Sequence, residues 1–408
     1  MKGAVSLPGD KSLSHRVAML AALANGPCRI LNYNRGADCE STLSCLRQLG
    51  VVISAAPASA DSGHQSGNDD LVISSSSLVP SEKPLDCGNS GSTMRMLTGL
   101  LAGQDLPAVL IGDLSLIRRP MMRLAEPLRL MGVVLSLRDE EFAPIVLQEG
   151  AKQPVVYRMP VPSAQVKSAI LFAGIRLPGT RVSEPVPTRD HTERLFEHLK
   201  IQPGRPVSAF EYDVPGDPSA AAFFVVGALL QPDSELTFPG LLMNPHRVAF
   251  LRKIQQSGAP IEIRNRRMIQ NELVADVRVR SGKLTAPIRI TPEEVPSLVD
   301  EIPALSLLGT VCGFEVSGAS ELRFKECDRI EAMVTNLDSM SVRVDESEDG
   351  YRVWPGRMEE TVARTFGDHR IAMTFAVAGI EVDDPDCVRV SFPNFFSILE
   401  SVSANSNR

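Results

Sequence analysis

The sequence predicts an α/β protein made of six similar repeats, divided between two lobes of about two hundred residues each. One observation is a polar loop that leads into about a dozen small and apolar residues and recurs six times along the chain. A second is the amphipathic stretch and the alternating β-type residues that follow several copies. The third is the length of 408 residues, which exceeds what a single hydrophobic core usually serves.

Each copy of the recurring phrase predicts a buried helix that starts at a polar loop. Gly, Pro, Ser, Asp and Asn in the loops favour helix starts, and the run that follows is apolar almost all round. The copies begin in PGDKS at Pro8, GNSGS at Gly88, PSAQ at Pro162, PGDPS at Pro215, LVDE at Leu298 and FGDHR at Phe366. A helix is therefore expected directly after each of these loops.

The stretches between the buried helices predict the other elements of the repeat. Amphipathic segments that close on a glycine lie at 46–50, 128–132 and 251–258, and alternating β-type residues follow each of them. Asp349-Gly350 lies between two alternating segments and predicts a hairpin turn. The repeat is therefore strand, buried helix, strand, amphipathic helix and hairpin, with three repeats before about residue 214 and three after it.

The helix starts also indicate a site for an anion. A helix N-terminus presents unpaired backbone N–H groups and about half a positive charge. Basic residues lie at several of these starts, namely Lys11, Arg16, Arg95, Lys167 and Arg370. Ordinary capping explains the polar residues of any single copy, but six copies with basic residues favour a strongly anionic ligand.

Composition and charge narrow the class of protein. A net charge of −7 argues against a general nucleic-acid or membrane binder. The seven cysteines show no CxxC or CxxH grouping, so we expect neither structural zinc nor a disulfide framework, and a reducing cytoplasm fits. No run approaches the ~20 apolar residues that span a bilayer, and we expect no signal peptide. The segment 55–70 and the final SANSNR are expected to be exposed and mobile.

Three dense clusters of charge contain the candidate chemistry. The loop GDLSLIRRPMMRL holds Arg118, Arg119 and Arg123 ahead of a helix, although neighbouring arginines are often only a solvated surface pair. ELRFKECDRIEAM alternates charges at one-to-four spacing, which an exposed ion-paired helix face would also explain. FGDHR sets a carboxylate, an imidazole and a guanidinium together before a buried helix.

Eight segments are more specific in combination than any one of them: PGDKSLSHR, GNSGSTMR, GDLSLIRRPM, SAQVKSAIL, EPVPTRDHTER, LVDEIPAL, FKECDRI and GDHRIAM. In this order they resemble the motifs of the 5-enolpyruvylshikimate-3-phosphate synthase family, over essentially the whole chain. The resemblance implies a two-lobed inside-out α/β barrel of six βαβαββ repeats, three per lobe, with helices inside and sheets outside. It also implies lobes of residues 1–10 plus 215–408 and of residues 11–214, with the active site in the cleft between them.

The same resemblance implies an enolpyruvyl transferase of the shikimate route to aromatic amino acids. In the family reaction, the enolpyruvyl group of phosphoenolpyruvate moves to the 5-hydroxyl of shikimate 3-phosphate, and phosphate leaves. The resemblance implies no metal ion, no organic cofactor, no nucleic-acid partner and no membrane, and a monomeric cytoplasmic enzyme that glyphosate targets. Because unit charges 4 Å apart repel by about 4 kcal/mol at an effective dielectric of 20, two such anions need a cationic site.

The resemblance also assigns roles to individual residues. Shikimate 3-phosphate would be bound by Lys11, Ser12, Arg16, Ser163, Ala164, Gln165, Thr188, Arg189, Asp300 and Lys325. Phosphoenolpyruvate would be bound by Lys11, Asn89, Gly91, Arg119, Gln165, Arg329, His369 and Arg370. The catalytic residues would be Asp300, which accepts the proton of the 5-hydroxyl, Glu326 with Lys11, which deliver a proton to the methylene carbon, and Lys325, which bonds the substrate hydroxyl. A tetrahedral adduct forms and then loses phosphate.

Three positions depart from one branch of the family. Glu321 stands where that branch has an asparagine, Ala164 where it has a second serine, and Val390 near the place of a lysine. With SAQVKSA and RDHTER, these differences resemble the second sequence branch of the family. Gly91 leaves open the space that a methyl group would fill, so we expect glyphosate to compete with phosphoenolpyruvate.

Three alternatives remain open. The UDP-N-acetylglucosamine enolpyruvyl transferase family has a similar fold, but its mobile loop carries a catalytic cysteine, and residues 112–122 contain none. An RNA-end cyclase would need nucleotide chemistry and a basic face that this chain lacks. A non-catalytic anion-binding protein is the third alternative, but anion binding gains nothing from the carboxylates of Asp300 and Glu326.

Overall fold

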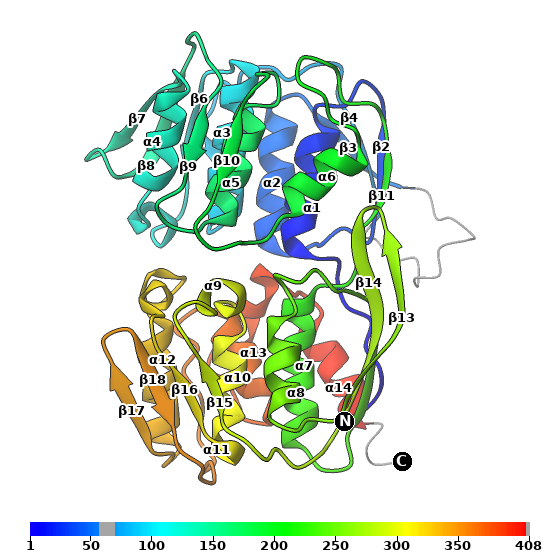
Figure 1. The fold of residues 1–408 in the computed structure, drawn as a ribbon, viewed down its shortest axis with the longest axis vertical. Helices are drawn as coiled ribbons and strands as arrows, with labels where there is room; N and C mark the ends of the chain where they lie inside the picture. Colours follow the sequence, from blue (N-terminus) through cyan, green and yellow to red (C-terminus); the bar gives the residue numbers. More distant parts are fainter. Residues whose placement is uncertain (57–69, 405–408) are drawn as a thin grey trace. The chain divides into compact units, whose positions relative to one another are not determined.

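The computed structural model describes residues 1–56 and 70–404, which fall into two compact units. Unit 1 comprises Met1–Pro8 and Pro215–Arg408, and unit 2 comprises Gly9–Val214 (Figure 1). Most of the segment 55–70 and the last four residues of SANSNR, expected to be exposed and mobile, lie outside the described residues. In the described part of the chain, no helix combines the length and the apolarity needed to cross a membrane.

In its described residues, unit 2 contains two four-stranded sheets and one two-stranded sheet, in the orders β11-β2-β4-β3, β5-β6-β8-β7 and β10-β9. The first two strands of each four-stranded order are parallel and the other neighbours are antiparallel. The strands are β2 (Cys28–Leu31), β3 (Val52–Ala55), β4 (Leu71–Ser74), β5 (Leu85–Asp86), β6 (Ala108–Ile111), β7 (Val134–Arg138), β8 (Phe142–Gln148), β9 (Val156–Arg158), β10 (Arg181–Ser183) and β11 (Glu211–Asp213).

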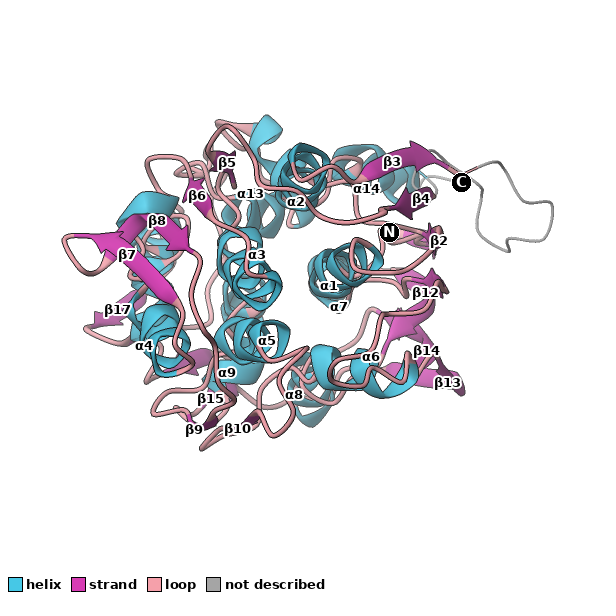
Figure 2. Cartoon of the chain, turned by 90° about the horizontal axis from the view of Figure 1, so that it is seen from above, coloured by secondary structure: helices cyan, strands magenta, loops and turns pink. Residues whose placement is uncertain are grey.

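The helices of unit 2 include three buried ones, α1 (Lys11–Ala21), α3 (Gly91–Gln104) and α5 (Ala164–Ala173), which lie inside the strands in Figure 2. α3 and α5 pack so closely that a Cβ on Gly99 would lie 2.3 Å from the carbonyl oxygen of Ala169, so only glycine fits there. The more exposed helices are α2 (Ala37–Gln48), the 3₁₀ turn η1 (Leu116–Arg118), α4 (Met122–Leu130) and α6 (His191–His198).

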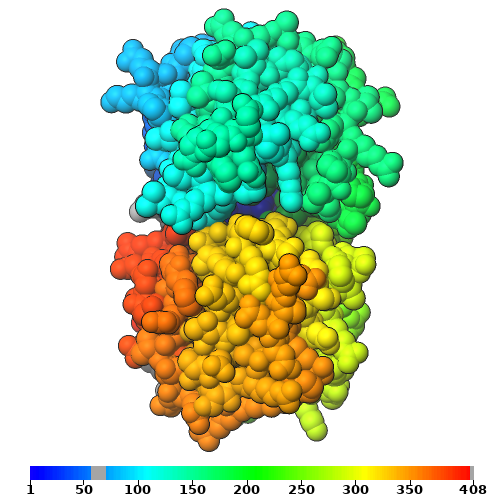
Figure 3. Space-filling model, turned by 90° about the vertical axis from the view of Figure 1, so that its left-hand side faces the viewer, coloured from blue at the N-terminus to red at the C-terminus, as the bar shows by residue number. Residues whose placement is uncertain are grey.

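The described residues of unit 1 form two four-stranded sheets, in the orders β1-β12-β14-β13 and β15-β16-β18-β17. As in unit 2, the first two strands of each order are parallel and the other neighbours are antiparallel. The predicted hairpin at Asp349-Gly350 is the β17–β18 pair, with its turn at Glu348-Asp349. β17 is largely exposed, on the face that Figure 3 shows, whereas β18 is mostly buried. The strands are β1 (Lys2–Ala4), β12 (Glu235–Leu242), β13 (Ile261–Ile269), β14 (Glu272–Arg280), β15 (Ile288–Ile290), β16 (Phe314–Val316), β17 (Val344–Ser347) and β18 (Gly350–Val353).

The buried helices of unit 1 are α7 (Pro218–Leu230), α10 (Ile302–Leu307) and α13 (His369–Val377), and they contact one another. α7 is buried along nearly its whole length, as its uniformly apolar sequence predicts. The other helical segments are α8 (Ala249–Gln256), α9 (Val295–Leu298), α11 (Gly309–Cys312), η2 (Ser320–Phe324), α12 (Arg329–Ser339), η3 (Pro385–Val390) and α14 (Phe395–Ala404). The α/β class with helices enclosed by sheets is thus confirmed.

One sheet in each unit takes its first strand from a distant part of the chain. β1 pairs in parallel with β12, placing Lys2 opposite Glu235. β11 pairs in parallel with β2, placing Glu211 opposite Arg29. The chain leaves β1 for α1 of unit 2 and leaves β11 for α7 of unit 1, so neither strand joins the unit of the helix that follows it.

Two repeats are shorter than the predicted pattern. The third keeps only β9 and β10, and the Pro- and Gly-containing segment 201–210 replaces its hairpin. In the sixth, the described residues form only the isolated bridge Ala363–Val382 in place of a sheet. Proline cannot donate to a strand ladder, and the segment 381–394 contains two prolines and three aspartates, which disfavour strands.

Candidate active site

Three helices of unit 2 begin at motif residues with the same kind of cap. Asp10 Oδ1 accepts a hydrogen bond from the Leu13 N–H at 2.8 Å at the start of α1. Ser90 caps α3 and Ser163 caps α5 in the same way. The first turns of these helices therefore present the predicted residues Lys11, Ser12, Gly91, Ala164 and Gln165 where helix dipoles favour anions.

Lys11 is held by a carboxylate from the neighbouring helix. Its ammonium donates to Asp38 Oδ2 at 2.8 Å, and the two side chains are only 17% and 9% exposed. Asp38 lies in the first turn of α2, where the helix dipole also favours its negative charge. The ion pair therefore sets the position of the Lys11 ammonium at the start of α1.

Asn89, Gly91 and Arg119 come together at the start of α3, as predicted. Arg119 Nη2 donates to Asn89 Oδ1 at 2.7 Å. Asn89 Nδ2 donates in turn to Asp113 Oδ2 at 2.6 Å. A Cβ on Gly91 would lie 2.6 Å from Arg95 Nη1 and 3.5 Å from Arg119 Nη1. Two guanidinium groups therefore reach the Gly91 backbone, which suits an anion with two acidic groups.

Gln165 connects the N-termini of α3 and α5. Its Nε2 donates to Ser92 Oγ at 2.9 Å, and its Oε1 accepts from Arg95 Nη1 at 2.9 Å. Ser92 and Arg95 both belong to the first turns of α3. The predicted residue Gln165 thus lies within the same cluster as Gly91.

Arg16 is almost fully buried and joins three helices. Its Nε donates to Thr192 Oγ1 and its Nη2 to Ser168 Oγ, both at 2.8 Å, and its Nη1 donates to the Ser12 carbonyl at 2.7 Å. Arg189 Nη1 lies 3.3 Å from Ser12 Oγ and donates to it. The structure therefore brings Ser12, Arg16 and Arg189 together and gives Arg16 several partners within the protein.

Lys167 does not provide the cation at the start of α5 that the sequence suggested. Its ammonium pairs with Glu184 at 2.7 Å and with Glu193 at 2.8 Å, and its side chain is buried. Glu184 also accepts from the Thr188 hydroxyl and backbone N–H, both at 2.7 Å. Two carboxylates oppose one ammonium here, so Lys167 serves this local network, and the network holds Thr188.

Arg329 lies at the centre of a buried cluster in unit 1. Its side chain is 1% exposed, and its Nε donates to Asp368 Oδ2 at 2.8 Å. Its Nη2 donates to Glu326 Oε2 at 2.6 Å. Burial alone would lower the pKa of this guanidinium, but the carboxylates of Asp368, Glu326 and Asp300 raise it above its ordinary value. Arg329 therefore remains a buried cation.

Asp300 lies between two guanidinium groups. Its Oδ1 is 3.8 Å from Arg329 Nη1 and 3.4 Å from Arg370 Nη2, and its carbonyl accepts from Arg370 Nη1 at 3.0 Å. Arg329 Nη1 is buried and makes no hydrogen bond to any described residue. A buried donor without a hydrogen bond is costly, so this group is suited to an anionic ligand.

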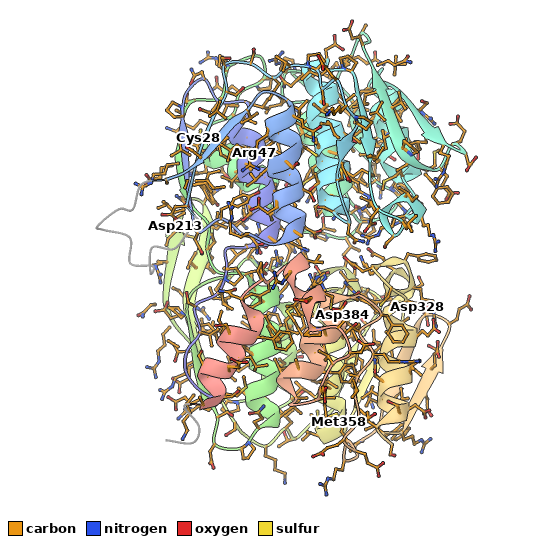
Figure 4. The ribbon with its side chains drawn as sticks, turned by 180° about the vertical axis from the view of Figure 1, so that it is seen from behind. Cys28, Arg47, Asp213, Asp328, Met358 and Asp384 are labelled. Atoms are coloured by element: carbon orange, nitrogen blue, oxygen red, sulfur yellow. The ribbon has the colours of Figure 1, made fainter. Side chains whose placement is uncertain are left out.

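The remaining predicted residues of unit 1 lie around this cluster. His369 is the first residue of α13, next to Asp368, and it is buried. Lys325 pairs with Glu321 at 2.5 Å, so Glu321, the residue that departs from one family branch, holds the lysine. Asp328, labelled in Figure 4, caps α12 by accepting from the N–H groups of Ile330 and Glu331.

Four carboxylates that are not among the site residues expected from the sequence each hold one of those residues: Asp38, Asp113, Glu184 and Asp368. Asp368 and Asp38 lie at helix starts, a signal that normally indicates capping alone. Asp113 and Glu184 lie in loops and have no such signal. The sequence indicates Arg95 only as a cation at a helix start, and the structure adds it to the group around Gly91.

Cys327 lies inside the cluster but is not an activated nucleophile. Burial raises the pKa of its thiol, and the neighbouring Asp368 raises it further. Burial likewise raises the pKa of Cys387 to about 12. In the described residues, no three His, Cys, Asp or Glu side chains group as metal ligands.

The sequence matches known proteins along nearly its full length. A family model described as EPSP synthase (3-phosphoshikimate 1-carboxyvinyltransferase) matches residues 1–399. The 3-phosphoshikimate 1-carboxyvinyltransferase of Chlorobium phaeovibrioides is 44% identical, with 98% of this chain and 99% of that protein aligned. The protein of the same name from Salinibacter ruber is 41% identical, with 99% and 98% aligned.

Solved structures show the same similarity in three dimensions. EPSP synthase from Acinetobacter baumannii superimposes with a TM-score of 0.83 at 32% identity, covering 98% of this chain and 95% of that one. The enolpyruvyl transferase NikO from Streptomyces tendae shares the fold, with a TM-score of 0.75 at 15% identity over 98% and 94% of the two chains. The resemblance inferred from the eight segments is confirmed, and the chain belongs to the EPSP synthase (3-phosphoshikimate 1-carboxyvinyltransferase) family.

Proposed function

We propose that this chain transfers the enolpyruvyl group of phosphoenolpyruvate to the 5-hydroxyl of shikimate 3-phosphate and releases phosphate. Family membership supports the reaction class. The observation that supports the residue roles best is the Asp300 carboxylate between Arg329 and Arg370. A carboxylate in that position can accept a proton where fixed cations hold an anionic substrate.

The reaction proceeds by addition and elimination. Asp300 takes the proton of the 5-hydroxyl while that oxygen bonds to C2 of phosphoenolpyruvate, and Glu326 with Lys11 delivers a proton to the methylene carbon C3. The product of this step is a tetrahedral adduct. C3 then returns a proton to Glu326 with Lys11, the bond between C2 and the phosphate oxygen breaks, and the enolpyruvyl ether and phosphate are released.

Phosphoenolpyruvate has one set of proposed contacts, in which cationic groups predominate. The proposed contacts of phosphoenolpyruvate are Lys11, Asn89, Gly91, Arg119, Gln165, Arg329, His369 and Arg370. The guanidinium groups among them bind carboxylate and phosphate through paired N–H donors. His369 is proposed to orient its neighbours in this group.

Shikimate 3-phosphate has a second set of proposed contacts, in which hydroxyl groups and helix N-termini take part. They are Lys11, Ser12, Arg16, Ser163, Ala164, Gln165, Thr188 and Arg189 in unit 2, and Asp300 and Lys325 in unit 1. We further propose a monomer in the cytoplasm, which light scattering of the purified chain and fractionation of cells would test.

The first experiment measures phosphate release from phosphoenolpyruvate with shikimate 3-phosphate as acceptor and, in parallel, with UDP-N-acetylglucosamine. Release with shikimate 3-phosphate alone is expected. Release with the nucleotide sugar alone would assign the chain to the other transferase reaction. No phosphate release from well-folded protein with either acceptor would favour a non-catalytic anion-binding protein.

The role of Asp300 is tested by Asp300→Asn. We expect a loss of about 10²–10⁴-fold in kcat, as for other general bases, with unchanged circular dichroism. Asp386→Asn is the matched control, because the Asp386 side chain is 82% exposed and its carboxylate forms a surface ion pair with Arg389. Equal activity of the two variants would contradict the assignment.

A further inference from the structure

A buried chain of hydrogen bonds joins the three helices α1, α2 and α3. His15 Nδ1 lies 2.7 Å from Thr42 Oγ1, and Thr42 Oγ1 lies 2.7 Å from Thr93 Oγ1. Thr93 Oγ1 is within reach of two acceptors, Ser90 Oγ at 2.8 Å and the Asp38 carbonyl at 3.2 Å. The four side chains of this chain, His15, Thr42, Thr93 and Ser90, are buried.

The position of each hydrogen follows from counting donors. The Thr93 hydroxyl has one hydrogen, which it gives to Ser90 or to the Asp38 carbonyl. The bond between Thr42 and Thr93 therefore uses the hydrogen of Thr42. His15 Nδ1 must then be the donor to Thr42, which makes His15 the neutral ring with its hydrogen on Nδ1.

A second observation agrees with this tautomer. His15 Nε2 is buried and has no hydrogen-bond partner among the described residues. A hydrogen on Nε2 would be a buried N–H without an acceptor. Burial lowers the pKa of His15 to about 3; Asp38 opposes this shift, while Lys11 and Arg16 add to it, so the ring stays neutral.

The chain of hydrogen bonds ends next to residues that the proposed function assigns to phosphoenolpyruvate. Ser90 caps α3, between Asn89 and Gly91, and accepts from the Thr93 N–H at 3.1 Å. The carboxylate of Asp38, whose carbonyl lies near Thr93, holds the ammonium of Lys11. Lys11 lies one turn before His15 in α1. The chain therefore links the cation at the start of α1 to the cap of α3.

We propose that His15 is a positioning residue that acts through Thr42 and Thr93 to hold the cap of α3 in register with Lys11, and so sets the affinity for phosphoenolpyruvate. The inference rests on the proposed function, since that function assigns Lys11, Asn89 and Gly91 to this substrate. His15 does not touch the substrate. Its effect reaches the substrate through the N-terminus of α3, so it falls on binding of phosphoenolpyruvate and leaves the chemical step in place.

The test compares two substitutions of the same kind in the full-length chain. Thr42→Val removes the hydroxyl that links His15 to Thr93 and keeps the shape of the side chain. Thr98→Val is the control, because Thr98 is equally buried and its hydroxyl donates within α3, to the Met94 carbonyl at 2.7 Å. We expect Thr42→Val to raise the KM for phosphoenolpyruvate about fivefold, the effect of one net hydrogen bond. The kcat and the KM for shikimate 3-phosphate should stay within about twofold.

His15 itself is tested by a pair of variants. The side-chain amide of His15→Asn can place an N–H near the position of Nδ1, whereas His15→Leu has no donor. We expect the asparagine to restore most of the affinity that the leucine loses. Equal affinities of the two variants, or a change in kcat with no change in KM for phosphoenolpyruvate, would overturn the proposal.

Two readouts do not depend on turnover. Calorimetric binding of phosphoenolpyruvate to Thr42→Val and Thr98→Val measures the same difference even if the wild-type chain releases no phosphate, a result that would refute the proposed function alone. Nitrogen-15 NMR of the imidazole should show the hydrogen on Nδ1 between about pH 5 and 8. A hydrogen on Nε2, or a titration in that range, would contradict the network.

Discussion

Replacing Arg329 by methionine should destabilise unit 1 strongly, because it removes a buried cation that contacts three carboxylates. Asp368 and Glu326 each accept a hydrogen bond from Arg329, and Asp300 lies 3.8 Å away. Arg329 is 1% exposed and Asp368 is 0% exposed, so water cannot replace the lost donors. Removing one partner of a buried ion pair typically costs about 3–5 kcal/mol, and we expect Arg329→Met to lie in this range.

The chain provides both a local probe and a matched control. Trp354 is the only tryptophan of the protein and lies in unit 1, so its fluorescence in urea follows the unfolding of this unit. Arg289→Met makes the same substitution at an exposed ion pair, in which Arg289 and Glu315 are 70% and 49% exposed. The control should cost less than about 1 kcal/mol, as surface pairs do.

A third variant tests whether unpaired carboxylates cause the loss of stability in Arg329→Met. If the cost comes from unpaired carboxylates, adding Glu326→Gln to Arg329→Met removes one of them and should recover part of the lost free energy of unfolding. Equal free energies of unfolding for Arg329→Met and Arg289→Met would refute the argument that Arg329 compensates this cluster. Additive effects of Arg329→Met and Glu326→Gln on the free energy of unfolding would show that the two side chains do not interact.

Three further predictions concern pH, inhibitor binding and thiol reactivity. Because His15 has a pKa of about 3 when folded and about 6.5 when unfolded, only the unfolded state gains a proton between these values. The free energy of unfolding of the wild type should therefore fall by about 1.4 kcal/mol per pH unit below pH 6.5 relative to that of His15→Asn. Urea unfolding at several pH values measures both, and an equal pH dependence of the two proteins would contradict this. Gly91→Ala places a methyl group 2.6 Å from Arg95 Nη1, so this guanidinium occupies the space that the sequence suggested was open and must shift in the variant. Because the backbone of glyphosate is longer than that of phosphoenolpyruvate, its inhibition constant should rise more than the KM for phosphoenolpyruvate; wild-type inhibition only far above that KM would refute the expected competition. Burial raises the pKa of the Cys327 thiol, so this residue should react with iodoacetamide at pH 8 far more slowly than glutathione does. Equal reaction rates measured by mass spectrometry would contradict this prediction.

The repeated phrase in the sequence predicted the buried helices because it combines two local signals. Asp10, Ser90 and Ser163 cap the helices that follow them, and each run after the cap is apolar. The observed starts at Lys11, Gly91 and Ala164 follow directly, and the turn before Gly350 lies within one residue of its predicted place. These features depend on neighbours a few residues apart, which is why sequence alone determines them.

Features that depend on contacts between residues far apart in the sequence could not be predicted from these local signals. The pairing of β1 with β12 joins residues more than two hundred positions apart, and no local pattern distinguishes it from pairing with the nearer β2. The loss of hairpins in the third and sixth repeats shows the same limit, because a strand forms only where a neighbouring strand accepts its hydrogen bonds.

In the candidate site, too, some features follow from the sequence and others only from the tertiary structure. The sequence and its family resemblance determined which residue types bind the two anions, because Lys11, Arg119, Arg329 and Arg370 lie in recognisable motifs. Only the tertiary structure decided which carboxylate holds each cation. Asp38 pairs with Lys11, Asp368 pairs with Arg329 across 39 positions, and Glu184 and Glu193 remove Lys167 from the set of candidate anion contacts. Ion pairs form through space and follow helix packing, so their partners depend on the fold rather than on spacing along the chain.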